Sequence, residues 1–306
     1  MKKVIRPVLT VAILLGLFAF GRQSQGVVPK TVEAETRTIA KTQYIGTIEK
    51  IDKSGKDIRI AVDLKHAGLF KFPNNLADGL PITDKDADGV IDALDAHPDQ
   101  AGPLSNAVID VPYKGKIYVF RLNIQNDYLD VFRYRLPHVL HESGDNVASF
   151  VVKQDPYLRE LVDQAKLYAA QDKEVDAREL LLALVKNTTY NSDAYTGKLE
   201  YPKYPIETLA DKSGDCEDLA ILAANLIGEL NGYDSAAFVF FPEHMGLGLK
   251  TTAEEVKNRQ NNQWHASQVG PGKEKYLYQE VTDPAWQLGQ MPREYAGKLA
   301  VIYTIK

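Results

Sequence analysis

The chain has 306 residues, of which 44% are hydrophobic and 25% are charged, and its formal net charge at pH 7 is −5. This composition is typical of a globular protein with room for one large domain or two small ones, and the acidic balance argues against a nucleic-acid partner. The single cysteine excludes an internal disulfide framework.

The N-terminal segment is typical of an exported protein. Residues 1–7 are basic, and an uncharged apolar run from Val8 to Phe20 follows them, which is shorter than the roughly 20 residues of a spanning helix. Residues 1–26 are therefore predicted to be either a cleaved signal peptide or an uncleaved membrane anchor. We expect a secreted, periplasmic or cell-surface protein that touches a membrane only through this segment.

Residues 27–77 are predicted to form a small β-rich region. Between Thr36 and Leu64, alternating apolar residues surround a turn at residues 53–56, which is typical of short strands joined by a hairpin.

The acidic stretch within residues 78–102 predicts a calcium-binding loop. Carboxylates recur at alternate positions, a glycine allows the sharp turn, and further carboxylates follow at the spacing that oxygen ligands of calcium require. The predicted ligands are Asp84, Asp86, Asp88, the carbonyl of Val90, Asp92 and Asp95. Because His97 and Pro98 do not continue a helix, the stretch resembles the calcium loops of thrombospondin type 3 repeats more than an EF-hand.

The remaining chain, residues 103–306, reads as one α+β domain. Strands are expected from Ser105 to about Arg135, and a polar loop from Leu136 to Asn146. Asp155 and Pro156 predict the start of a helix that ends near Ala170, and residues 175–185 predict a second helix.

Cys216 is predicted to lie at the start of a third helix. Apolar residues recur at helical spacing after it, and Asn231 and Gly232 form a stop signal. A thiol at a helix N-terminus is favoured as the nucleophilic thiolate, although the neighbouring acids oppose this effect. We therefore expect the pKa of Cys216 to be lower than that of a free cysteine.

His244 and an acid further along the chain are the predicted partners of this thiol. His244 follows the buried-looking run 236–241, whereas the competing His265 stands in a polar, glycine- and proline-rich setting. Glu280 is the expected residue that orients the histidine, with Asp283 as the alternative. The backbone N–H of Cys216 and the side chain of Tyr204 are the expected donors to an oxyanion.

These motifs resemble the transglutaminase-like (papain-related) superfamily, in its bacterial and archaeal branch. The resemblance rests on GDCEDLAILAANLIGELNGYD, PEHMGLGL and YLYQEVTDPAWQLGQMP, and it extends from about Val111 to the C-terminus. It implies a helix carrying the cysteine, packed on an antiparallel sheet, with Cys216, His244 and Glu280 as the triad. Glu-Val-Thr replaces the commoner Asp-Pro-Thr, which keeps Asp283 as an alternative.

The resemblance implies a cysteine enzyme that forms an acyl-enzyme on peptide or side-chain amides. Hydrolysis by a protease or amidase is favoured over transamidation, with a protein or peptide as substrate. The alternative is a non-catalytic, calcium-stabilised surface or scaffold module with the same fold. Neither the substrate nor the oligomeric state follows from the sequence.

Overall fold

The computed structural model describes residues 31–39, 43–51, 57–65, 72–73, 76–193, 200–252, 254–255, 268–269, 276–295 and 298–305. The predicted signal peptide or anchor and His265 lie outside these residues. Within them, no helix has both the length and the apolar character of a membrane span.

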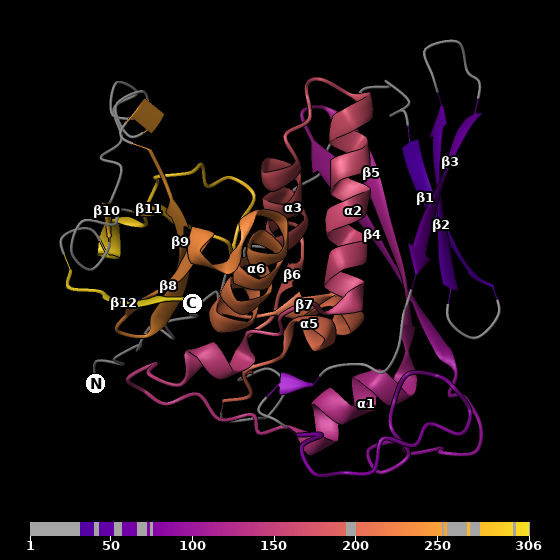
Figure 1. Ribbon diagram of the computed structural model, residues 1–306. Helices are drawn as coiled ribbons and strands as arrows, with labels where there is room; N and C mark the ends of the chain where they lie inside the picture. The colour runs from indigo at the N-terminus through magenta and orange to yellow at the C-terminus, as the bar shows by residue number, and fades with distance from the viewer. Residues whose placement is uncertain are drawn as a thin grey trace, which may run out of the picture.

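The architecture is α+β, with helices between two five-stranded sheets (Figure 1). The first sheet has the order β3-β2-β1-β5-β4, in which β1 pairs in parallel with β5 and the other neighbours are antiparallel. Its strands are β1 (Thr31–Ile39), β2 (Gln43–Ile51), β3 (Asp57–Lys65), β4 (Leu104–Tyr113) and β5 (Lys116–Gln125). The β-rich region of residues 27–77 thus shares a sheet with the chain that follows it.

The second sheet is antiparallel throughout and has the order β10-β11-β9-β8-β12. Its strands are β8 (Ala236–Phe241), β9 (His244–Lys250), β10 (Gln268–Val269), β11 (Tyr276–Gln279) and β12 (Val301–Thr304). A separate two-stranded parallel ladder joins β6 (Thr189–Tyr190) to β7 (Ser213–Gly214), directly before the cysteine.

Three helices fill the space between the sheets: α2 (Pro156–Gln171), α3 (Ala177–Lys186) and α6 (Cys216–Asn231) (Figure 1). Two further helices, α1 (Asn126–Arg135) and α5 (Pro205–Asp211), contact each other beside them. Single 3-10 turns cover Val147–Phe150, Tyr233–Ser235 and Arg293–Tyr295.

The predicted helix starts are confirmed at α2 and α6. The Asp155 carboxylate accepts hydrogen bonds from the N–H groups of Tyr157 at 2.9 Å and Leu158 at 3.0 Å, so it caps α2. Helix α6 begins at Cys216 and ends at Asn231, and it is capped by Gly232, whose φ of 91° is readily adopted only by glycine.

The prediction of β structure up to Arg135 is wrong after Gln125, where α1 begins. The apolar residues Tyr128, Leu129, Val131 and Phe132 are buried on one helical face. Burial of this face against α5 and β5 favours the helix, whereas the alternation in the preceding strand had suggested its continuation.

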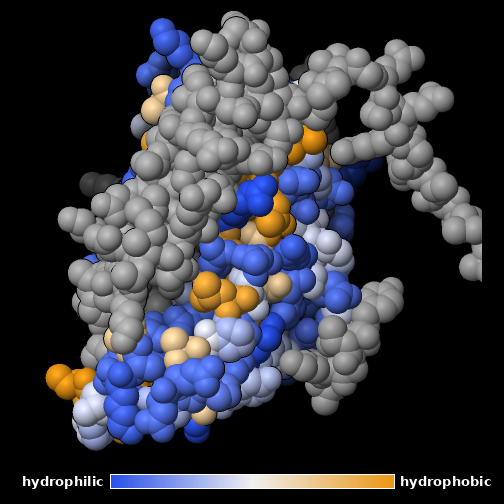
Figure 2. All heavy atoms as spheres, turned by 90° about the vertical axis from the view of Figure 1, so that its right-hand side faces the viewer, coloured by the Kyte–Doolittle hydropathy of each residue, from blue (hydrophilic) through white to orange (hydrophobic). Residues whose placement is uncertain are grey.

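The core lies around α6, on which Leu219, Leu222, Ala223 and Leu226 are fully buried. A helix that is apolar on nearly all sides belongs in the interior, and α6 contacts α2 and α3 on one side and β8 and β9 on the other. By contrast, the coloured surface on the side of the first sheet is mainly hydrophilic (Figure 2). The central position of α6 fixes its first residue, Cys216, against the second sheet.

Candidate active site

Cys216 occupies the first position of α6, preceded by the non-helical residue Asp215. Its side chain lies against β9, where the backbone N–H of Met245 interacts with the sulfur. Met245 directly follows His244, so the thiol is next to the backbone of the predicted histidine. Within the described residues, no hydrogen bond joins the sulfur to the His244 ring, and the Sγ–H donates to Glu217 Oε2 at 3.1 Å.

His244 and Glu280 form a direct pair, with 2.9 Å between His244 Nε2 and Glu280 Oε2. A carboxylate only accepts hydrogen bonds, so this contact holds the imidazole proton on Nε2 and leaves Nδ1 as the basic nitrogen. His244 is the first residue of β9, and Glu280 directly follows β11, the strand beside it. The sheet register therefore sets this pair.

Glu280 is fully buried and well supplied with donors. Its Oε1 accepts the N–H groups of Val281 at 3.0 Å and Thr282 at 3.2 Å and the Thr282 hydroxyl at 2.8 Å, while Oε2 also accepts the Tyr278 hydroxyl at 2.7 Å. Burial opposes ionisation, but His244 and these donors lower the pKa of Glu280 to about 2. Because this value is below the ordinary 4.5, ionised Glu280 stabilises the fold above about pH 4.5, and that stabilisation is lost as the pH falls towards 2.

Two tyrosines that were not predicted complete the surroundings of His244. Tyr295 stacks on the imidazole with 4.7 Å between the ring centroids and an interplanar angle of 8°. Tyr278, two residues before Glu280, donates to it, and its ring lies against β9, where a Cβ on Gly246 would lie 2.5 Å from the Tyr278 hydroxyl oxygen. Gly246 therefore gives Tyr278 the space it needs. The sequence alone could not show this role, because it depends on the pairing of β9 with β11.

The expectation of a lowered thiol pKa is wrong for this arrangement. Burial, followed by the charge of Glu217, raises the pKa of Cys216 well above its ordinary value, and the Met245 N–H offsets this only in part. Burial and the charge of Asp215 raise the pKa of Glu217 itself to about 9. The resting cysteine is therefore a neutral thiol, and a base must remove its proton before it can attack.

Replacing Glu217 by glutamine is expected to move the pH midpoint of Cys216 alkylation to lower pH. In the wild type Glu217 ionises before the thiol, so the thiol loses its proton against a negative charge. Above about pH 9, where Glu217 is ionised in the wild type, each unit by which the substitution lowers the thiol pKa raises the thiolate fraction, and with it the rate, about tenfold. The measurement is the iodoacetamide rate at fixed pH values from 9 to about 10, with the exposed Glu243→Gln as control. Equal rates in the wild type and in Glu217→Gln would show that Glu217 does not act on the thiol.

Tyr204 is not available as the predicted oxyanion donor. Its side chain is fully buried, and its hydroxyl donates to the Pro137 carbonyl at 3.3 Å. The ring packs against Phe132 and Phe150. Since a tyrosine hydroxyl has one proton to donate, Tyr204 has a packing role.

Asp283, the alternative orienting residue, contacts the backbone of its own loop. The carboxylate accepts the Ala285 N–H at 2.6 Å, whereas Glu280 contacts His244. Of the two acids, the structure brings only Glu280 to the histidine.

Tyr190 is a residue near the thiol that the sequence did not single out. It pairs with Gly214 through β6 and β7, and its side chain is half exposed. Burial raises the pKa of its hydroxyl to about 12, as do the nearby charges of Cys216, Asp215, Glu217 and Glu280. Tyr190 therefore lies at the edge of the site with a proton that can be donated at neutral pH. Its exposed setting, four residues after α3 ends, gave no sequence pattern that would mark it as a site residue.

Acidic side chains surround the N-terminus of α6. One oxygen each from Asp193, Glu200 and Glu217 lies within 4.8 Å of the others. Burial and the charge of Asp215 raise the pKa of Asp218 to about 8. These acids disfavour ionisation of the Cys216 thiol, because the thiolate would add another negative charge beside them.

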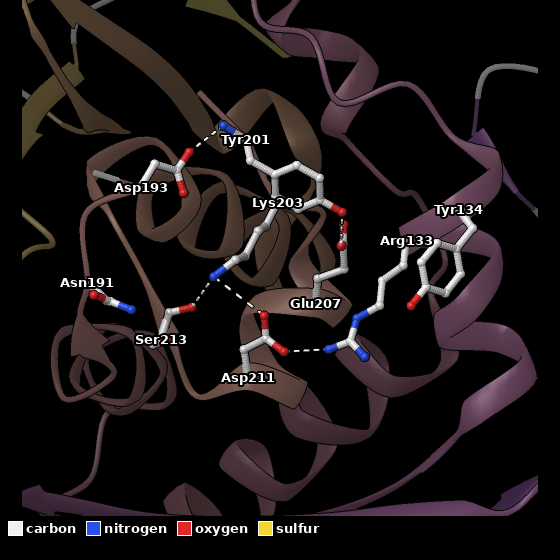
Figure 3. Close-up of a pocket in the computed structure, with 9 residues that line it drawn as sticks. All are labelled: Arg133, Tyr134, Asn191, Asp193, Tyr201, Lys203, Glu207, Asp211 and Ser213. Atoms are coloured by element: carbon white, nitrogen blue, oxygen red, sulfur yellow. Dashed lines mark hydrogen bonds and ion pairs between the residues drawn. The ribbon is translucent and has the colours of Figure 1, made fainter. Parts of the chain in front are cut away.

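A polar pocket of about 480 Å³ adjoins this acidic group through Asp193 (Figure 3). Lys203 Nζ donates to the Ser213 carbonyl at 3.0 Å and lies 3.5 Å from an Asp211 oxygen, and Asp211 also pairs with Arg133. The complete lining is Arg133, Tyr134, Asn191, Asp193, Tyr201, Lys203, Glu207, Asp211 and Ser213. Its donors and acceptors suit a polar chain or side chain more than an apolar one.

The predicted calcium ligands fall into three groups. Oxygens of Asp84, Asp86 and Asp88 lie within 4.8 Å of one another. Asp92 is not part of this group and accepts the Lys85 N–H at 3.0 Å. Asp95 lies instead with His97 and Asp127, again within 4.8 Å. Val90 is fully buried below the turn, and its N–H donates to Asp88 Oδ1 at 2.8 Å.

The donor chemistry of the loop fits calcium. All of its grouped side chains except His97 offer carboxylate oxygens, the ligand type that calcium prefers. Asp86 Oδ2 and Asp95 Oδ2 are buried without a hydrogen-bond partner among the described residues. Burial, then the charges of Asp86, Asp95 and Asp84, raise the pKa of Asp88 to about 7 despite the Val90 N–H bond, so ionisation of the loop is unfavourable without a cation.

Comparison of the chain with family models, with curated proteins and with solved structures found no match.

Proposed function

We propose that this chain is an exported cysteine enzyme of transglutaminase-like fold that forms an acyl-enzyme on peptide or side-chain amides and releases it by hydrolysis. The observation that carries the proposal is the 2.9 Å pair of His244 Nε2 and buried Glu280 Oε2, beside the sulfur of the only cysteine. The helix carrying the cysteine packs on an antiparallel sheet that supplies both other residues, which supports this fold.

The proposed reaction begins with proton transfer from Cys216 Sγ to His244 Nδ1, the nitrogen that Glu280 leaves free. The sulfur attacks the amide carbonyl, and the negative charge that develops on oxygen is stabilised by the Cys216 backbone N–H at the helix start. The imidazolium then gives its proton to the leaving amine, and a thioester remains. Attack by water, with His244 again accepting a proton, releases the acid and restores the thiol.

Ionised Glu280 stabilises the imidazolium in both steps. A buried carboxylate that stays charged at neutral pH has the electrostatic role of the triad acid, because its attraction to the ring grows when the ring gains a proton. This attraction also compensates for the raised thiol pKa, since the thiolate needs to form only together with the imidazolium.

We further propose that the loop of residues 78–102 binds Ca²⁺, with Asp84, Asp86, Asp88 and Asp95 as carboxylate ligands. When bound, the ion would neutralise carboxylates that otherwise repel one another. Its expected contribution is to stability and not to the acyl transfer.

Acylation of Cys216 by p-nitrophenyl acetate tests the enzymatic proposal. We expect one acetyl group per wild-type chain by intact mass spectrometry, none above background on Cys216→Ala, and p-nitrophenol release beyond one equivalent if water resolves the thioester. Release that stops at one equivalent and resumes on addition of a primary amine would instead assign transamidation.

The raised thiol pKa favours one competing function, a non-catalytic surface module that retains the fold. In that case the wild type and Cys216→Ala would react with the ester equally. Such a result would overturn the enzymatic proposal.

A further inference from the structure

Asp127 is a fully buried carboxylate outside the acidic loop that points towards it. It stands in the first turn of α1, and its Oδ1 is 2.7 Å from His97 Nδ1. Its Oδ2 is buried without a hydrogen-bond partner among the described residues. Leaving a buried carboxylate oxygen unpaired is costly, so this atom needs a partner that the described residues do not supply.

Two carboxylates of the loop also have a buried oxygen without a hydrogen-bond partner among the described residues. These oxygens are Asp86 Oδ2 and Asp95 Oδ2. Oxygens of Asp95 and Asp127 lie within 4.8 Å of each other. Burial and, to a smaller extent, the charge of Asp127 raise the pKa of Asp86 and of Asp95, which places Asp86 in the same neighbourhood.

Two other acids of the loop, Asp84 and Asp88, have partners for both of their oxygens. Asp84 accepts the N–H groups of Asp88 and Gly89, at 3.2 and 3.1 Å. Asp88 accepts the Val90 N–H and the side-chain amide of Gln125, the residue that precedes α1. Among the described residues, the buried unpartnered oxygens of the loop therefore belong to Asp86 and Asp95, the acids on which the charge of Asp127 acts.

Gly102 lies directly against the Asp127 carboxylate. A Cβ at this residue would lie 1.9 Å from Asp127 Oδ2. Its φ is not in the left-handed region, so backbone conformation does not require a glycine there. The requirement for glycine comes from the approach of the carboxylate.

We infer that Asp127 is a further ligand of the loop cation, so that Asp127 of α1 shares one Ca²⁺ with the proposed loop carboxylates, Asp86 and Asp95 among them. This inference rests on the proposed calcium loop and adds a ligand from outside it. His97 orients Asp127 through Oδ1 and leaves Oδ2 for the ion, an arrangement in which a histidine and a carboxylate position a metal ligand. The ion thereby joins the loop to the helix that contacts α5.

Calcium titration of the chelator-treated full chain tests this inference, by calorimetry and by thermal unfolding. For Asp127→Asn we expect at least tenfold weaker Ca²⁺ binding and a higher melting temperature without calcium, because a repelling charge is removed. Gly102→Ala should also weaken binding, since it displaces the carboxylate, but should not raise the calcium-free melting temperature. Asp163→Asn, an exposed charge change on α2, is the matched control and should behave as wild type.

The outcomes separate this inference from the proposed calcium loop. If Ca²⁺ neither binds to nor stabilises the wild type, both fail. If Asp86→Asn weakens binding but Asp127→Asn and Gly102→Ala do not, the loop stands and the role of Asp127 is overturned. A melting temperature of Asp127→Asn that falls equally with and without calcium, at unchanged affinity, would likewise show that Asp127 only stabilises α1.

Discussion

Replacing His244 by alanine is expected to slow acylation of Cys216 by p-nitrophenyl acetate about 100- to 10,000-fold. Burial keeps the thiol protonated, so the reaction depends on a base that removes its proton. His244 is placed for this role because its Nε2 is held by Glu280 and its backbone adjoins the Met245 N–H that contacts the sulfur. The rate of acetyl incorporation, followed by mass spectrometry, is the measurement.

Two other histidine variants make this result specific. His141 is exposed and paired with Asp145, so His141→Ala should retain the wild-type rate. His265→Ala examines the competing histidine of the sequence. If His265→Ala loses acylation and His244→Ala keeps it, the histidine is wrongly assigned. Equal rates in the wild type and in His244→Ala would remove the base from the proposed mechanism.

The positions of the triad residues could be predicted because each stands at a local boundary. Cys216 follows a cap position and is the first residue of an apolar helix, and His244 begins a strand after a turn. Each of these patterns can be recognised from a few neighbouring residues. Their meeting depends on the pairing of β9 with β11, which no local pattern specifies. The resemblance supplied that step for Glu280, and the hydrogen bond to His244 agrees with it.

The electrostatics of the thiol could not be predicted in the same way. The helix N-terminus favours the thiolate, but the effect is modest in comparison with burial beside Glu217. Burial depends on packing against β9, and so does the contact of Tyr278 with Glu280 above Gly246. The helix N-terminus alone would lower the pKa of Cys216, but burial in the tertiary structure raises it instead.

Asp127 shows the same limitation for the loop. The spacing of carboxylates identifies acids within one segment, but a residue 32 positions after Asp95 enters only through folding. The start of α1, on which Asp127 lies, was also missed, because β structure was predicted to continue to Arg135.

Replacing Glu280 by glutamine is expected to lower the acylation rate about 1,000- to 10,000-fold, as loss of the orienting charge does in comparable triads. Three donors converge on Glu280 Oε1, two from Thr282 and one from Val281, so the amide oxygen of glutamine should occupy that place. The amide NH₂ then faces His244 Nε2 and donates to it. The histidine proton is consequently forced onto Nδ1, the nitrogen that has to accept the proton of the thiol.

Asp283→Asn is the matched comparison, because it makes the same chemical change three residues away. Among the described residues, the Asp283 carboxylate accepts a hydrogen bond from the Ala285 N–H alone, and an amide oxygen can accept that bond equally well, so the acylation rate should stay within a few-fold of the wild type. Melting curves of both variants separate lost chemistry from lost fold. A Glu280→Gln variant that melts like the wild type but acylates slowly supports the tautomer argument. If Asp283→Asn is the slower of the two, Asp283 and not Glu280 orients the histidine.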